Sequence, residues 1–129
     1  MSPVRPVILV ADDDRALCDL LREFLEEEGY AVVCAGTGQA ALAIIEAGDP
    51  DLLLLDWRLS GLDGAEVCRR ARALAPPGGR RLPIVVASAF GDAERAAALG
   101  AGADEYVAKP FELDALLAVI ARYLPAPRA

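Results

Sequence analysis

A run of aspartates, one isolated aspartate, one serine and one lysine are the side chains of this sequence best placed to do chemistry. Aspartates 12–14 follow the apolar run VILV and Ala11, and Asp56 directly follows four leucines. Ser88 ends another apolar run, and Lys109 is the only lysine among the thirteen Lys and Arg residues. The chain has no histidine. It therefore cannot use a Ser-His-Asp or Cys-His mechanism, and it cannot itself carry a phosphohistidine.

A cluster of these carboxylates would need a compensating cation. If Asp12, Asp13 and Asp56 meet, each pair of charges about 4 Å apart repels by roughly 4 kcal/mol at an effective dielectric constant near 20. A partly hydrated, oxygen-ligated dication relieves such repulsion, and Mg²⁺ is the usual one. Lys109 would add a compact positive charge, which the wider and planar arginine could not place in the same tight pocket.

Pro110 bears on the direction in which Lys109 points. A peptide bond that precedes proline can be cis at a cost of only about 0.5–1 kcal/mol. A cis bond at this position would turn the lysine back toward the acids. We therefore predict a cis peptide bond between Lys109 and Pro110.

The fold that must position these residues alternates short apolar runs with segments of helical periodicity. The runs predict strands at 7–10, 30–35, 51–56, 82–88 and 105–108. Helices are predicted between the strands and after the last one. The first two end at Gly29 and Gly48, and the others span about 65–75, 92–99 and the residues from 111 onward, with a turn-rich connector at 75–81.

Apolar residues at helical spacing indicate which helix faces turn toward the core. In the first helix these are Leu17, Leu20, Leu21, Phe24 and Leu25, and in the third they are Val67, Ala71 and Leu74. Asp14 and Thr37 are of the residue types that cap helix N-termini.

Five successive strand–helix units with unbroken apolar strands predict an α/β fold with a parallel sheet covered on both faces. In open sheets of this kind, ligands bind at the carboxyl ends of the strands. Each polar residue at those ends has an ordinary explanation as a cap, a turn residue or a solvated side chain. The arrival of the aspartates, Ser88 and Lys109 at one edge of the same sheet is what favours a functional site.

Length and composition set further expectations. With 129 residues and 55% hydrophobic residues, the chain is expected to form a single domain over 1–129, with a core at about 6–124 and a short tail at 125–129. The net charge of −7 disfavours direct contact with nucleic acid. The sequence shows neither an apolar run of membrane-spanning length nor a secretory signal, which predicts a cytoplasmic protein. Its three widely spaced cysteines favour buried thiols over a zinc site or a disulfide framework.

Four segments, ILVADDD, LLLLDWRLSGLDG, IVVASAF and LGAGADEYVAKPFELDAL, occur in the order and spacing typical of one family. Through them the chain resembles the receiver domains of two-component response regulators, the chemotaxis-regulator-like family of phosphorelay signal transduction. The resemblance covers essentially the whole chain. It implies a flavodoxin-like, doubly wound (βα)5 fold whose parallel strands have the order 2-1-3-4-5.

The resemblance also implies a role for each residue of the predicted site. Asp56 would accept a phosphoryl group from a histidine kinase, a histidine phosphotransfer protein or a small phosphodonor. Asp13 and Asp56 would bind Mg²⁺ through their side chains, Arg58 through its backbone carbonyl, and Asp12 through a water molecule. Lys109 would contact a phosphoryl oxygen.

Two further residues would convert the modification into a change of surface. Ser88 would hydrogen-bond the phosphoryl group, and Tyr106 would rotate inward, altering the face made by the fourth helix, the fifth strand and the fifth helix. A downstream effector would recognise that face. The domain would be a monomer or a weak, phosphorylation-dependent dimer, and its only catalysis would be its own phosphorylation and dephosphorylation.

The chain departs from the family pattern at a few positions, and two other functions compete with the main one. Ser88 replaces the commoner threonine, Trp57 places a bulky ring beside Asp56, and Asp114 and Val119 stand where the winged-helix transcription-factor branch tends to carry basic residues. One alternative is a degenerate receiver used only for protein contacts. The other, a haloacid-dehalogenase-like phosphatase, requires a DxDxT motif, and the segment DDDRA lacks its threonine.

Overall fold

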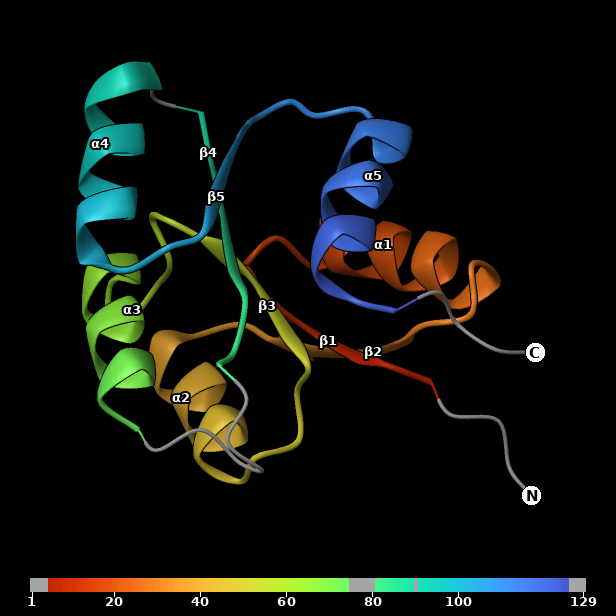
Figure 1. Cartoon of the computed structure of the whole chain (residues 1–129), viewed down its shortest axis with the longest axis horizontal. Coiled ribbons are helices and arrows are strands. Elements are labelled where there is room, and N and C mark those ends of the chain that lie inside the picture. The colour runs from red at the N-terminus through yellow and green to blue at the C-terminus, as the bar shows by residue number, and fades with distance from the viewer. Residues whose placement is uncertain (1–4, 75–80, 90, 126–129) are drawn as a thin grey trace.

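The computed structural model describes residues 5–74, 81–89 and 91–125, which form a parallel sheet between two layers of helices (Figure 1). The five strands are β1 (Val7–Ala11), β2 (Ala31–Ala35), β3 (Leu52–Asp56), β4 (Ile84–Ser88) and β5 (Glu105–Ala108). Their order is β2-β1-β3-β4-β5, and every pair of neighbours is parallel. The predicted α/β fold with strand order 2-1-3-4-5 is thus confirmed.

The helices divide unequally between the two faces of the sheet. Figure 1 shows α1 (Arg15–Glu27) and α5 (Leu113–Tyr123) together on one side. On the other side lie α2 (Gly38–Glu46), α3 (Gly64–Ala73) and α4 (Gly91–Ala101). Among the described helices, none combines the length and apolar character needed to cross a membrane.

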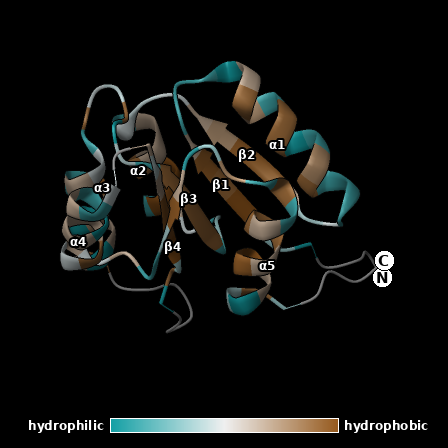
Figure 2. Ribbon diagram, turned by 90° about the horizontal axis from the view of Figure 1, so that it is seen from above, coloured by the Kyte–Doolittle hydropathy of each residue, from teal (hydrophilic) through white to brown (hydrophobic). Residues whose placement is uncertain are grey.

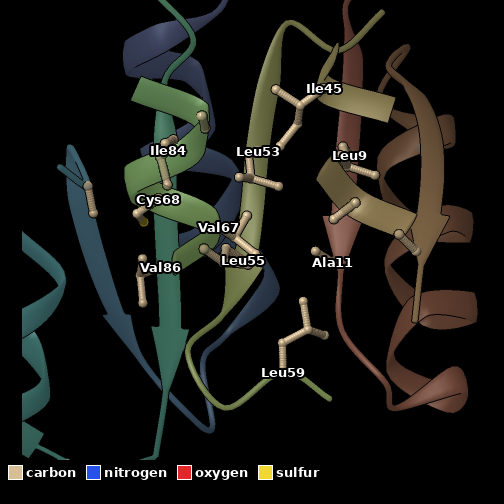
Figure 3. Packing of buried hydrophobic residues seen from close by; sticks show 14 of the residues in the cluster. Leu9, Ala11, Ile45, Leu53, Leu55, Leu59, Val67, Cys68, Ile84 and Val86 are labelled. Carbon is tan, nitrogen blue, oxygen red and sulfur yellow. The ribbon is translucent and has the colours of Figure 1, made fainter. Parts of the chain in front are cut away.

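Alternating side chains of the strands supply two separate cores, because successive residues of a strand point to opposite faces. Ile8 and Val10 of β1 pack with residues of α1 and α5. Leu9 and Ala11 pack on the other face, with residues of α2, α3 and α4 (Figure 3). Figure 2 shows the hydrophobic residues gathered in the strands and on the sheet-facing sides of the helices. Since a fully buried leucine contributes about 1.5–3 kcal/mol, the buried side chains of the strands and of the helices packed on them stabilise the fold.

Side-chain caps fix where three of the helices begin. Asp14 Oδ1 accepts a hydrogen bond from the backbone N–H of Leu17 at 3.1 Å, and Thr37 Oγ1 accepts one from Ala40 at 3.1 Å. Both caps agree with the sequence analysis. Asp63, which the sequence analysis did not single out, caps α3 in the same way. Each cap of this kind stabilises its helix by about 1 kcal/mol.

Two leucines that were predicted to face the core are exposed instead. Leu20 has a relative exposure of 49%, because it lies about 100–160° around the helix from the buried residues Cys18, Leu21 and Leu25. Leu74 has a relative exposure of 36%. Helix α3 ends at Ala73, and the backbone of Leu74 is extended, so this side chain leaves the helical repeat.

Some element boundaries also differ from the predictions. Strand β4 begins at Ile84 and not at residue 82, and the backbone carbonyl of Leu82 instead accepts a hydrogen bond from Arg72. Helix α5 begins at Leu113 and not near residue 111, because Glu112 keeps an extended backbone at the N-cap. Most of the predicted connector at 75–81 and most of the tail at 125–129 lie outside the described residues.

Candidate functional site

Three carboxylates meet where β1 and β3 end. The two strands are hydrogen-bonded neighbours with Ala11 opposite Leu55, so the residues that follow, Asp12 and Asp56, lie side by side. Asp12, Asp13 and Asp56 each offer a carboxylate oxygen, and these oxygens all lie within 4.8 Å of one another. Asp12 is buried, Asp56 is partly buried and Asp13 is exposed. The carboxylates therefore form a cluster that is accessible from one side.

Lys109 directly follows the carboxyl end of β5, and its side chain extends to this cluster. Its Nζ lies 2.8 Å from Asp12 Oδ2 and 3.6 Å from Asp56 Oδ1. Its backbone N–H donates to the carbonyl of Ser88 at 2.8 Å, which ties it to the neighbouring strand. The Lys109–Pro110 peptide bond is cis, as the sequence analysis predicted. The only lysine of the chain thus lies among the acids that it was expected to meet.

Burial and neighbouring charges alter the acidity of both partners. The pKa of Asp56 is raised, mainly because burial disfavours its charged form. Lys109 and the backbone N–H of Arg58 oppose this rise, and the charges of Asp12 and Asp13 add to it. Burial also disfavours the charged form of Lys109. The hydrogen bond and charge of Asp12, together with Asp56, outweigh that effect and hold the pKa of Lys109 above its ordinary value.

The donor atoms of the cluster suit a hard dication. All three candidate ligands are carboxylate oxygens, which are the protein ligands that Mg²⁺ prefers. Asp12 Oδ1 also accepts the backbone N–H of Asp14 at 2.9 Å, and Asp13 Oδ2 accepts the hydroxyl of Ser60 at 2.6 Å. The backbone N–H of Arg58 lies 3.3 Å from Asp56 Oδ1, so that residue also borders the cluster. The cluster therefore fits Mg²⁺.

The two expected switch residues are linked to each other at the end of β4. Ser88 is buried, and its backbone carbonyl accepts the hydroxyl of Tyr106 at 3.3 Å. The hydroxyl of Ser88 donates a hydrogen bond to Glu94 of α4. The other carboxylate oxygen of Glu94 lies 3.0 Å from Nε of Arg58. Ser88, the last residue of β4, and Arg58, in the loop after β3, are therefore joined through one carboxylate.

The loop that follows β3 is held against the N-terminus of α2. The backbone N–H of Gly38 donates to the carbonyl of Ser60 at 3.0 Å, and the backbone N–H of Leu62 donates to Gln39 Oε1 at 3.1 Å. A Cβ atom on Gly38 would lie 2.0 Å from the carbonyl oxygen of Leu62. Only glycine therefore permits this approach, which keeps Ser60 in reach of Asp13.

Sequence reasoning did not identify Glu94, Ser60 or Gln39 as neighbours of the site. Glu94 lies in the first turn of a predicted helix, where an acidic residue is expected for its effect on the helix dipole alone. Ser60 lay inside the segment LLLLDWRLSGLDG without a distinguishing feature. Gln39 was part of the second predicted helix. Their contacts span 6 to 47 residues of sequence, so no local pattern signals them.

Comparison with known proteins places the chain in a family. Residues 8–121 match the model of the response regulator receiver domain. The response regulator MprA of Mycolicibacterium vanbaalenii is 48% identical over 117 residues, which are 90% of this chain and 48% of the relative. MprA of Mycobacterium avium is 48% identical over 112 residues, which are 86% of this chain and 47% of the relative. The chain thus spans about half the length of these curated relatives.

Solved structures with the same fold include two receiver domains of more than 30% identity. A CheY-like receiver domain protein of Methanospirillum hungatei is 34% identical with a TM-score of 0.83, over 92% of this chain and 93% of that one. The receiver domain of a sensor histidine kinase of Pseudomonas aeruginosa, with a magnesium ion coordinated in its active site cleft, is 31% identical. Its TM-score is 0.82, over 93% of this chain and 98% of that one. The family match, the strand order and the relatives together show that this chain belongs to the response regulator receiver domains of two-component systems.

Proposed function

We propose that this receiver domain accepts a phosphoryl group on Asp56 from a histidine kinase or a histidine phosphotransfer protein, in a reaction that depends on Mg²⁺. The observation that carries the proposal is the position of Lys109 Nζ, which lies 3.6 Å from Asp56 Oδ1 inside a cluster of three carboxylates. A nucleophilic carboxylate flanked by a cation and by further oxygen ligands is the arrangement that phosphoryl transfer requires.

The carboxylate cluster would hold the metal ion. Asp13 and Asp56 would be side-chain ligands, Arg58 would contribute its backbone carbonyl, and Asp12 would act through a water molecule. When bound, Mg²⁺ would offset the negative charge of the carboxylates and of the phosphoryl oxygens. The receiver domain of the Pseudomonas aeruginosa sensor kinase, which has a magnesium ion in its active site cleft, supports this assignment.

In the transfer step, a carboxylate oxygen of Asp56 forms a bond to phosphorus while the phosphorus–nitrogen bond of the donor phosphohistidine breaks. The leaving imidazole nitrogen takes up a proton, and Asp56 becomes an aspartyl phosphate. Lys109 would contact a phosphoryl oxygen and stabilise the charge that develops on it. Because Lys109 already lies between Asp12 and Asp56, little reorganisation of its ammonium group is needed.

The modified domain would signal by a shift between two arrangements. Ser88 would turn its hydroxyl to a phosphoryl oxygen, and Tyr106 would move inward, which would change the face formed by α4, β5 and α5. Such a shift occurs only if the phosphoryl group interacts better with one arrangement than with the other. A coupling free energy of about 1–3 kcal/mol is typical of these switches.

The remaining assignments concern the setting of the domain. We propose that 1–129 is one domain, that its effector is a protein or domain bound through α4, β5 and α5, and that it is a monomer or a weak dimer that depends on phosphorylation. The net charge of −7 argues against direct binding of nucleic acid by this domain. Reaction with a histidine kinase requires a cytoplasmic location.

Incubation with acetyl phosphate or phosphoramidate and Mg²⁺, followed by measurement of the intact mass, tests the phosphorylation. We expect a labile phosphoryl adduct that requires Mg²⁺ and disappears in Asp56→Asn. Asp49→Asn is the matched control, since Asp49 is exposed and lies beyond α2, before the strand that Asp56 ends. Absence of an adduct on the unmodified sequence would contradict the proposal and favour a protein-contact module.

A further inference from the structure

Glu94 connects two residues that border Asp56. It lies in the first turn of α4, and its side chain has a relative exposure of only 15%. One carboxylate oxygen accepts the hydroxyl of Ser88, and the other lies 3.0 Å from Nε of Arg58. We call this set of contacts between Ser88, Glu94 and Arg58 the Glu94 bridge.

Ser88, at one end of the Glu94 bridge, also contacts Lys109 and Tyr106. Ser88 has a relative exposure of 1%, and its backbone carbonyl accepts both the N–H of Lys109 at 2.8 Å and the hydroxyl of Tyr106 at 3.3 Å. A serine hydroxyl has a single proton to donate. While that proton is donated to Glu94, it is not donated to a group on Asp56.

We infer that Glu94 is a positioning residue that holds Ser88 in the arrangement of the unmodified domain, and that a phosphoryl group on Asp56 must displace it. The inference rests on the proposed function of Asp56 and adds a regulator of the same site. Glu94 competes with the phosphoryl oxygens for one proton. It also adds a carboxylate to a site that already contains three and that must accept more negative charge.

The two halves of the bridge do not contribute equally. The Arg58 side chain has a relative exposure of 62%, so its ion pair with Glu94 is screened by water and weak. The contact with Ser88 is partly buried, from a serine that is itself buried, and involves a charged acceptor, which makes it the stronger one. Glu94 is therefore expected to act mainly through Ser88.

Beryllofluoride, which with Mg²⁺ stands in for a phosphoryl group on an aspartate, is the probe for a first test. Its titration is followed by the fluorescence of Trp57, the only tryptophan, which neighbours Asp56. We expect Glu94→Gln to bind beryllofluoride roughly 3- to 10-fold more tightly than the unmodified sequence, because glutamine still accepts from Ser88 but loses the charge that strengthens the hydrogen bond. Equal or weaker binding would overturn the inference.

Glu66→Gln is the matched control for that titration. Glu66 also lies in the first turn of a helix and also pairs with arginines, Arg69 and Arg70, but its contacts are on the exposed side of α3. The Glu66→Gln variant should bind beryllofluoride with the same affinity as the unmodified sequence. An equal gain in Glu66→Gln would show a general effect of net charge and would overturn the inference. Should Glu94→Gln fold poorly, Glu94→Ala provides the same comparison.

A double-mutant cycle tests whether Glu94 acts through Ser88. In a Ser88→Ala background, Glu94→Gln is expected to give only a small gain in beryllofluoride binding, from the removal of one negative charge; a gain as large as with Ser88 present would overturn the inference. Without beryllofluoride, Glu94→Gln should also move the amide resonances of Ser88 and Tyr106 toward their beryllofluoride-bound positions, and unmoved resonances would count against it. If the unmodified sequence itself gives no beryllofluoride response, the proposed function fails, and the inference fails with it.

Discussion

At the residue scale, the single positive charge of Lys109 is shared unequally among the carboxylates around it. The ammonium group of Lys109 lies among three carboxylates. Its Nζ is 2.8 Å from Asp12 Oδ2 and 3.6 Å from Asp56 Oδ1, and is therefore 0.8 Å closer to Asp12. The positive charge of Lys109 therefore offsets the charge of Asp56 less than that of Asp12, and burial raises the pKa of Asp56. The proposed acceptor carboxylate is therefore held in an unfavourable environment, which is common for functional groups and costs stability.

We expect Asp56→Asn to raise the free energy of unfolding at neutral pH, without Mg²⁺, by about 1 kcal/mol. The sign follows from linkage. A carboxyl group with a raised pKa binds its proton more readily in the folded state, so the ionised form destabilises the fold at neutral pH. As the pH falls through the folded-state pKa of Asp56, the carboxyl group takes up its proton and the destabilisation is lost. The stability difference between Asp56→Asn and the unmodified sequence should then disappear.

Urea unfolding at neutral and at acidic pH measures this difference. Asp49→Asn, at an exposed position, should change stability little at either pH. Loss of stability in Asp56→Asn at neutral pH would show that Lys109 compensates Asp56 fully and that burial is not the dominant influence on this carboxyl group.

At the scale of elements, one arginine joins α3 to the strands on the edge of the sheet. Arg72, near the end of α3, donates to the carbonyl of Gly102 at 2.9 Å and to Asp104 Oδ2 at 2.7 Å. The same oxygen of Asp104 accepts the backbone N–H of Ile84, the first residue of β4, at 2.9 Å. Helix α3, strand β4 and the turn before β5 are therefore held by one side-chain network.

Arg72→Lys is expected to lower the free energy of unfolding by about 1–3 kcal/mol, because a lysine cannot reproduce the forked, planar set of donors. Arg70→Lys is the control, since Arg70 is exposed and forms an ion pair with Glu66 on the surface of α3. Chemical denaturation of both variants measures the effect. Equal stability of the two would mean that the Arg72 network contributes no more than a surface ion pair.

The apolar runs were sufficient to predict β1, β3 and β4, because a strand buried on both faces has few polar positions and is recognisable at once. The acids that end β1 and β3 could be paired in advance for the same reason, since parallel strands bring their carboxyl ends to one edge. Leu20 was wrongly predicted to be buried because its exposure depends on how α1 is rotated about its axis against the sheet. Leu74 was wrongly predicted to be buried because its exposure depends on where α3 ends. Glu94 was missed because its role depends on contacts with the end of β4 and with the loop after β3.

At the scale of the whole molecule, the three thiols differ in how far the fold buries them. Cys18 is buried between α1 and the sheet, Cys68 is buried between α3 and the sheet, and Cys34 of β2 is half-buried. Burial, followed by the neighbouring Cys34, raises the pKa of Cys18 to about 12, and burial raises that of Cys68 to about 11. Only the thiolate reacts with alkylating agents, so both buried thiols are inert in the folded domain.

We therefore expect iodoacetamide at mildly alkaline pH to modify Cys34 first, and to modify Cys18 and Cys68 only through unfolding of the domain. Because each core is bounded by the same sheet, opening either one requires loss of the packing on β1, β3 and β4, and the two buried thiols should react at similar rates. Peptide mass spectrometry over time measures the three rates, with urea-unfolded protein as the reference in which all three react. Faster modification of Cys18 than of Cys68 would show that α1 detaches from the sheet on its own, so that the helix beside the acidic cluster moves independently of the α2–α4 layer.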